Sequence, residues 1–302
     1  MFKNNCRQNV SSIQYKIFGQ PTVGKKSHYM ELKAEKDVLL IELTYKFLIE
    51  KGADQSLIKN QFVAWNSEHK SLNDIYFRLL ESGQNRDSSV NVIGKSIGGL
   101  ENLSSILYDF DPILTCVEYP FGSEERLLKD IISKLKPTGQ VRSSNKSKWP
   151  QYIKTIISGA YFLSKYANYN NFIKFINEYN KDVFSRSAVA LLISTEVFGL
   201  GFPLACDFLK ELGYTEFSKA DVHTKAILKE LNLIGSYHSK NIDYFTFHAM
   251  NRIANNCNIL PFDVDKLLWL IGGGNFYHDK EIIFKIGRKR DEFIQYAKNN
   301  GI

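Results

Sequence analysis

The chain has only four cysteines in 302 residues, and they are scattered along it. No two of them form a Cys-x-x-Cys pair, which excludes the common zinc and thiol-redox motifs. They also lack the close spacing of thiolates that holds an iron–sulfur cluster. We therefore expect reduced thiols, no metal and no cofactor, at the positions Cys6, Cys116, Cys206 and Cys257.

Long hydrophobic runs are also missing. No apolar stretch approaches the roughly 18 residues that are needed to span a bilayer. The first residues, Met1 to Asn5, are mostly polar and provide no secretory hydrophobic region. These two absences predict a cytoplasmic protein with no membrane contact.

The composition is otherwise that of a globular protein, with 44% hydrophobic and 24% charged residues. The length allows one large domain or two lobes. Lysine and arginine total 39 against 32 aspartates and glutamates, a net charge of +7. This excess favours a polyanionic partner such as nucleic acid, although many basic proteins have none.

Helical periodicity dominates the sequence. Leu72, Ile75, Tyr76, Leu79 and Leu80 form an apolar stripe, and the preceding serine can cap the helix. Comparable stripes occupy 38–51, 100–108, 125–135, 152–166, 171–180, 186–197, 203–212, 222–231 and 280–297. Alternation typical of a strand is found only at 13–18, and no solenoid repeat is present. The predicted fold class is all-α.

A basic segment, 136–148, interrupts the helical pattern. It contains a proline, a glycine, three serines and four basic residues, and it has no acid. A solvated linker and a loop that contacts a nucleic-acid backbone both fit this composition.

A glycine hairpin, Val197-Phe198-Gly199-Leu200-Gly201, joins two of the predicted helices. Pro203 suits the first turn of the second helix, and Gly213 suits its end. Uncovered backbone N–H groups in such a turn, together with the start of the next helix, can bind a phosphate oxygen. A plain connection between two packed helices has the same sequence pattern.

Asp221 lies 20 positions after Gly201 and precedes the helix expected at 222–231. Aspartate is a favoured N-cap, and a helix start favours a negative charge. The residues from the hairpin to this aspartate resemble the helix-hairpin-helix (HhH-GPD) DNA glycosylases, the superfamily of endonuclease III. There the hairpin reads Leu-Pro-Gly-Val-Gly and is followed, at this spacing, by Val-Asp-Val-His; this chain has Ala220-Asp221-Val222-His223.

A second match lies upstream. The residues from Gln84 to Asn91, Gln-Asn-Arg-Asp-Ser-Ser-Val-Asn, are similar to the endonuclease III segment Gln-Ala-Thr-Asp-x-Ser-Val-Asn. In that family the glutamine fills the gap that an extruded nucleotide leaves in the DNA stack. The resemblance implies that role for Gln84, with Asn85 and Arg86 beside it on the DNA.

The resemblance implies N-glycosidic bond cleavage with Asp221 as the catalytic carboxylate. It also implies DNA-backbone contacts by Gly199, Leu200, Gly201 and His223, and the hairpin could hold a monovalent cation. Bifunctional members carry a nucleophilic lysine two residues after the second hairpin glycine, where this chain has Pro203. A monofunctional enzyme without lyase activity is therefore expected, although Lys219 and Lys225 flank the aspartate.

The base pocket is the least defined part of the predicted site. Asp207, one turn after Pro203, could accept hydrogen bonds from a base, and Trp65 and Trp269 could stack on it. A surface acid and two core aromatics explain these residues equally well. Gly272-Gly273-Gly274 has no βαβ context, which favours a loop near the cleft over a nucleotide-binding motif.

The sequence thus predicts a two-lobed helical fold with a DNA-binding cleft between the lobes. A helical barrel at 62–215 carries the hairpin, and 1–61 with 216–302 forms the lobe of Asp221. The expected protein is a nucleoid-associated monomer that acts on duplex DNA. Repair of an altered base, defence against modified foreign DNA, and DNA binding without catalysis all remain open.

Overall fold

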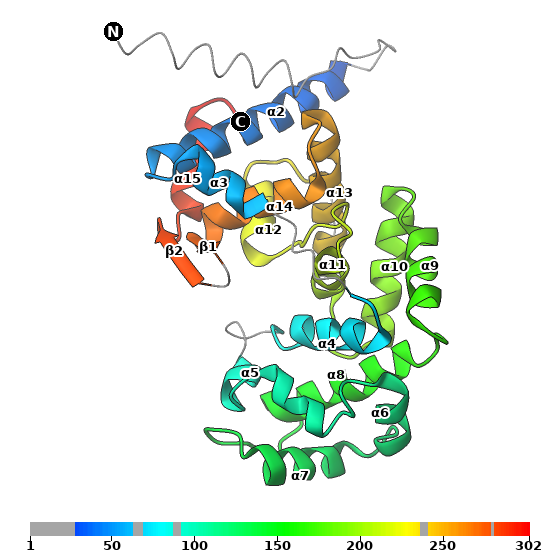
Figure 1. The fold of residues 1–302 in the computed structure, drawn as a ribbon. Helices are drawn as coiled ribbons and strands as arrows, with labels where there is room; N and C mark the ends of the chain where they lie inside the picture. Colours follow the sequence, from blue (N-terminus) through cyan, green and yellow to red (C-terminus); the bar gives the residue numbers. More distant parts are fainter. Residues whose placement is uncertain (1–27, 63–68, 87–91, 236–240, 279–280) are drawn as a thin grey trace. The chain divides into compact units, whose positions relative to one another are not determined.

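The chain divides into two compact units. A computed structural model describes residues 28–62, 69–86, 92–235, 241–278 and 281–302 (Figure 1). One unit comprises Met1–Val63 and Ala220–Ile302, and the other comprises Ala64–Lys219. The sequence-based boundaries, after residues 61 and 215, lie within a few positions of these. The second unit is therefore an insertion within the first.

The first unit is built around α14 (Pro261–Gly273). This helix packs against α2 (His28–Glu50), α12 (Val222–Glu230) and α13 (Ile242–Cys257). Buried residues cover most of the surface of α14, and a stripe of Asp263, Lys266, Trp269 and Gly273 is only half-buried. Two short helices, α3 (Gln55–Lys59) and the 3₁₀-helix η1 (Asn60–Phe62), follow α2.

The prediction of a helix at 280–297 is wrong for the first half of that range. An antiparallel hairpin of β1 (Asn275–His278) and β2 (Glu281–Lys285) precedes α15 (Arg290–Asn299). Phe276 pairs with Phe284, and the register shifts after Phe276. Gly287 adopts φ +71°, a left-handed conformation that separates β2 from α15. This hairpin is the whole of the β structure in the described part of the chain.

The second unit is centred on α8 (Lys148–Leu163), which packs against α4 (Leu72–Gly83), α6 (Pro112–Glu118) and α7 (Glu124–Leu135). Two buried hydroxyls join α4 and α8: Tyr76 donates to the Ile156 carbonyl at 2.7 Å, and Tyr152 donates to the Leu80 carbonyl at 3.0 Å. Both bonds satisfy polar atoms inside an apolar contact, which fixes how the two helices pack.

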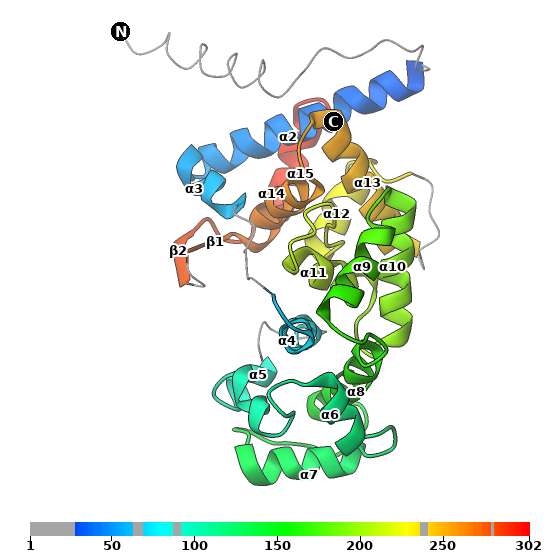
Figure 2. The same ribbon diagram turned by 45° about the vertical axis from the view of Figure 1, so that its right-hand side comes forward.

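The remaining helices of this unit lead to the hairpin. α9 (Tyr169–Tyr179) and α10 (Val183–Glu196) run side by side in both views (Figures 1 and 2), and α11 (Phe202–Glu211) follows the hairpin. α5 (Val92–Ser96) and the 3₁₀-helix η2 (Leu100–Ser105) complete the unit. The segment 136–147 contains no helix or strand.

Most of the predicted helices are confirmed, with ends that differ by a few residues. Ser71 caps α4 as predicted: its hydroxyl accepts the Asp74 N–H while Asp74 accepts the Ser71 N–H. The helix expected at 100–108 is instead the short 3₁₀-helix η2, and the strand at 13–18 lies outside the described residues. Within those residues, no helix has the length and apolarity needed to cross a membrane.

Candidate functional site

The hairpin between α10 and α11 has the predicted position and a fixed conformation. Val197 and Leu200 are fully buried, and the Phe198 N–H donates to the Ser158 hydroxyl on α8 at 2.9 Å. Gly199 adopts φ +86°, and a Cβ there would lie 2.8 Å from the Thr155 hydroxyl oxygen. A residue with a side chain would therefore be both strained and crowded at this position.

The hairpin amides differ in what they can offer to a ligand. The Leu200 N–H donates to the Val197 carbonyl at 3.2 Å, and the buried Leu200 side chain anchors the turn. The N–H groups of Gly199 and Gly201 donate no hydrogen bond within the described residues. These two amides are the ones able to bind an anion, and Leu200 contributes by holding the turn that presents them.

Two cations flank the hairpin. Phe198 is 38% exposed, with the Arg86 guanidinium 5.0 Å and the Lys154 amine 5.4 Å from its ring centre. Arg86 also donates to the Gln151 amide oxygen at 2.9 Å. Cation–π contacts hold positive charge beside an apolar ring without neutralising it. The fold thus brings together two predicted elements, the hairpin and Arg86, and adds Lys154, which the sequence reasoning missed.

Gln84 does not project into solvent in this structure. It is the C-cap of α4 and is only 6% exposed, and its side-chain oxygen accepts the Gly94 N–H at 3.1 Å. Asn85 is partly buried and donates to the Glu81 carbonyl at 3.3 Å. The rest of the matching segment, 87–91, lies outside the described residues. Gln84 therefore fastens α5 to α4 in the protein without DNA.

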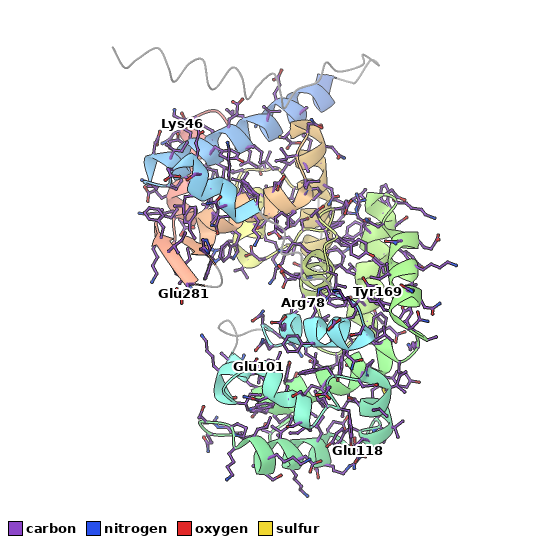
Figure 3. The ribbon with its side chains drawn as sticks, in the orientation of Figure 1. Lys46, Arg78, Glu101, Glu118, Tyr169 and Glu281 are labelled. Atoms are coloured by element: carbon purple, nitrogen blue, oxygen red, sulfur yellow. The ribbon has the colours of Figure 1, made fainter. Side chains whose placement is uncertain are left out.

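Asp207 is buried within the second unit and is not a surface acid. It is 7% exposed, and its carboxylate lies 3.3 Å from the amine of Lys210 and 3.3 Å from that of Lys219. Burial acts to raise the pKa of Asp207, but Lys219, Lys210 and Arg78 outweigh it and hold the pKa well below the usual range. Arg78 projects from α4, which packs against α11 (Figure 3).

The contact between Asp207 and a base stays a prediction, and in this structure the carboxylate is paired with two lysines. A carboxylate already paired with two lysines has little capacity left for a base. The carboxylate fastens the segment that leaves α11, because Lys219 is the last residue of the second unit. The sequence did not reveal its partner Lys219, twelve residues later.

Asp221 caps α12 as predicted. Its Oδ1 accepts the His223 N–H at 2.9 Å and the Thr224 N–H at 2.7 Å. No hydrogen bond to Oδ2 is found among the described residues. One carboxylate oxygen is therefore fixed by the helix, while the other can face a ligand.

His223 packs against the end of α14. A Cβ at position 272 would lie 2.3 Å from the Cβ of His223, so only glycine leaves room for this contact. Nδ1 of His223 is buried without a hydrogen-bond partner. Burial lowers the pKa of His223; Asp221 opposes this effect, and Arg290 and Arg288 add to it. The imidazole is therefore neutral near pH 7.

The two described residues of the predicted base pocket belong to different units. Trp269 of α14 is partly buried and stacks obliquely on Tyr277, with ring centres 5.8 Å apart. Asp207 belongs to the other unit, and Trp65 lies outside the described residues. Gly272 and Gly273 belong to α14 and not to a loop, so only Gly274 fits that expectation. Nothing in either unit by itself assembles a pocket from these residues.

Metal-ligating side chains do not gather in the described part of the chain. No group of three or more histidine, cysteine, aspartate or glutamate residues there could hold a metal ion. Cys206 and Cys257 are buried, and Cys116 is partly buried.

Comparison with known proteins identifies the fold. No family model and no curated protein matches the chain. It is similar in structure to the 8-oxoguanine glycosylase/lyase of Methanocaldococcus jannaschii, solved with a 15mer DNA containing 8-oxoguanine. The TM-score is 0.50 and the identity 14%, and the match covers 80% of this chain and all of the other.

A second solved structure, the 8-oxoguanine DNA glycosylase of Thermotoga maritima, gives a TM-score of 0.48 at 16% identity, with the same coverage. The predicted fold class is confirmed, because the chain is mostly helical and has the fold of the two-lobed M. jannaschii enzyme. At this identity the likeness concerns the fold alone.

Proposed function

We propose that this chain is a DNA glycosylase that hydrolyses the N-glycosidic bond of an altered base in duplex DNA. The observation that carries the proposal is the placement of Asp221, capping α12 through one oxygen 20 positions after a glycine hairpin with two available amides. Support comes from the fold, which the chain shares with an enzyme solved on DNA containing 8-oxoguanine. As in the sequence-based prediction, it acts as a monomer.

DNA binding is assigned to the hairpin and its flanking cations. The amides of Gly199 and Gly201 bind a phosphate oxygen, and Arg86 and Lys154 add charge-assisted contacts to the backbone. Extruding a nucleotide costs a few kcal/mol, which these contacts offset. Phosphate contacts carry no sequence information, so the choice of base is made elsewhere.

Catalysis is assigned to the second oxygen of Asp221. Breaking the bond between C1′ and the base nitrogen builds positive charge on the sugar, and a carboxylate beside C1′ stabilises it. The same oxygen can accept a proton from the water that attacks C1′. The products are the free base and an abasic site.

The chain is assigned glycosylase activity without lyase activity. Pro203, in the first turn of α11, has no amine to attack C1′. The lysines near Asp221 are held in ion pairs, Lys219 with Asp207 at 3.3 Å and Lys225 with Asp243 at 2.6 Å. Amines held in ion pairs with carboxylates are poor nucleophiles, which supports water as the attacking group.

Borohydride trapping tests this assignment. Under conditions where base is released, we expect no covalent protein–DNA adduct on reduction, because no Schiff base forms. A glycosylase/lyase such as the M. jannaschii enzyme serves as the positive control. An adduct in good yield would contradict the prediction, and its loss in Lys219→Ala or Lys225→Ala would identify the amine.

The released base identifies the substrate. Duplexes that contain oxidised, alkylated, mismatched or hypermodified bases are incubated with the protein, and free bases are identified by mass spectrometry. Release of a lesion base favours repair, whereas release of a hypermodified base favours defence against foreign DNA. Release of no base from any duplex would contradict the proposed function.

Gln84 can act as the wedge only if its side chain leaves the Gly94 N–H, to which it is bonded in this structure, and enters the DNA stack. We expect Gln84→Ala to destabilise the free protein by about 1–3 kcal/mol, because the buried Gly94 N–H loses its acceptor. Asn85→Ala is the matched control, since the Asn85 amide donates to the Glu81 carbonyl of α4, the helix that precedes it, at the longer distance of 3.3 Å. Urea unfolding measures both, and equal stabilities of the two variants would exclude the Gly94 bond as a stabilising contact.

Binding to a duplex with an abasic-site analogue then tests the wedge itself. If Gln84 fills the gap in the stack, Gln84→Ala binds this duplex more weakly than the wild-type protein, while binding to an intact duplex changes little. An equal loss on both duplexes would show that Gln84 acts only through the fold.

A further inference from the structure

Gln151 lies in the first turn of α8, and its side chain joins two other parts of the second unit. The side-chain oxygen accepts a hydrogen bond from the Arg86 guanidinium at 2.9 Å, and the side-chain nitrogen donates to the Asn145 carbonyl. The helix uses the backbone of this residue, whose N–H donates to the Ser147 carbonyl at 3.1 Å. The side chain is therefore a bridge between the residues that follow α4 and the segment that precedes α8.

The first of these bonds orients Arg86 at the hairpin. The guanidinium lies 5.0 Å from the ring centre of Phe198, and its Nη1 would lie 3.4 Å from a Cβ at Gly199. The same Nη1 donates to Gln151. An arginine side chain has several rotatable bonds, so contacts at both the face and the end of the guanidinium are needed to hold one orientation.

The second bond fastens the basic segment 136–148 just before α8. The other end of this segment is held at α5, where the N–H and the hydroxyl of Thr138 donate to the Ser96 carbonyl at 2.6 and 3.2 Å. Arg142 and Lys146 of the segment are exposed, and neither pairs with a carboxylate in the described part of the chain. The segment therefore carries positive charge, and hydrogen bonds to α5 and α8 keep it in place.

A glutamine amide suits this bridge because it has a donor and an acceptor in one group. A carboxylate could accept from Arg86, but it could not donate to a carbonyl and it would neutralise the guanidinium. The neutral amide leaves the charge of Arg86 for a phosphate oxygen. Arg86, Gln151 and Lys148 line the same small cavity, so the two cationic parts that Gln151 joins lie near one another.

We propose that Gln151 is a positioning residue for DNA binding, which orients Arg86 beside the hairpin and fastens the basic segment next to it. This inference rests on the proposed function and extends it, because Arg86 is there assigned to the DNA backbone. Gln151 itself makes no contact with DNA in this assignment. A phosphate at the hairpin amides meets a guanidinium whose direction is already fixed, so less conformational entropy is lost on binding.

Duplex affinity tests the coupling between Gln151 and Arg86. The full chain carrying Asp221→Asn is titrated with a duplex that contains a tetrahydrofuran abasic analogue. We expect Gln151→Met to lower affinity about tenfold, because Arg86 loses its orientation. In a protein that also carries Arg86→Met, the same substitution is expected to change affinity less than about twofold, since no guanidinium is left to orient.

Gln151→Glu separates orientation from charge. The glutamate can still accept from Arg86, but it neutralises the guanidinium and cannot donate to the Asn145 carbonyl. We therefore expect weaker binding, and a slope of log K against log salt that is smaller by about 1. If Gln151 served only the fold, a folded Gln151→Glu protein would bind the duplex as the wild type does.

Gln140→Met is the matched control. Gln140 is exposed and accepts from Arg142, two residues later, at 3.0 Å, so the same substitution breaks a local pair of an amide and a guanidinium. We expect its duplex affinity and its salt slope to equal those of the wild type. Urea unfolding of each variant shows that it is folded.

Two results would overturn the inference while base release by the catalytically intact protein leaves the proposed function standing. One is an affinity of Gln151→Met equal to that of Gln140→Met, and the other is the same loss of affinity with and without Arg86. Should Gln151→Met not fold, unchanged affinity and salt slope in Gln151→Glu would contradict the inference. Failure of the wild-type protein to bind any duplex would overturn both the inference and the proposed function.

Discussion

Asp221→Asn is expected to reduce base release by about 10²–10³-fold while duplex binding stays close to that of the wild-type protein. The asparagine oxygen can still accept the His223 and Thr224 N–H groups, which Asp221 binds at 2.9 and 2.7 Å. The fold at the start of α12 is therefore preserved, and only the negative charge beside the sugar is lost. Single-turnover release of the identified base, measured alongside duplex affinity, gives both quantities.

The controls separate chemistry from folding. Asp221→Ala also removes the cap and is expected to cost about 1 kcal/mol of stability, which Asp221→Asn retains. Unchanged base release in Asp221→Asn would remove Asp221 from the catalytic role. A wild-type protein that binds duplex DNA but releases no base from any substrate would instead support a binding module without catalysis.

Asp207→Ala is expected to destabilise the protein by about 3–5 kcal/mol. Lys210 is buried with Asp207, and removal of the carboxylate leaves its charge without this partner. The matched control is Asp243→Ala, which breaks the more exposed pair with Lys225 and is expected to cost at most about 1 kcal/mol. Urea unfolding of the three proteins at pH 7 provides the comparison, and similar losses in both variants would contradict a special role for Asp207.

The loss of stability in Asp207→Ala is expected to change with pH in a defined direction. The pKa of Asp207 is lower in the folded protein than in the unfolded chain, where it is about 3.9. Its contribution to stability is therefore fully present above that value and is lost as the pH falls toward the folded-state pKa. The stability difference between wild type and Asp207→Ala should shrink below about pH 4. A difference that is constant with pH would show that packing, not charge, is responsible.

Local signals in the sequence predicted much of this structure. The cap of α4 by Ser71, the glycine hairpin and the cap of α12 by Asp221 all depend on a few adjacent residues. Such features are set by backbone hydrogen bonds within one turn, so the sequence carries them directly. The all-α fold class was predicted from the helical periodicity of the apolar residues.

The misses arose where distant residues decide the outcome. α14 is mostly apolar and buried over most of its surface, and its half-buried side combines Asp263 and Lys266 with Trp269, so its periodicity is weak. The apolar pattern at 280–297 predicted one helix, but its first half pairs with β1 as the strand β2, and α15 begins only after the left-handed Gly287. The pairing of Asp207 with Lys219 and that of Gln84 with the Gly94 N–H were not predicted, since tertiary packing brings these partners together.

The contact between His223 and Gly272 links two positions that lie far apart in the chain. Because a Cβ at 272 would lie 2.3 Å from the Cβ of His223 itself, a side chain at 272 requires the loss of the Cβ at 223. Substitutions at these two sites should therefore compensate one another: alanine at 272 is tolerated better when 223 is also reduced to glycine. In related sequences, the two positions would be expected to vary together.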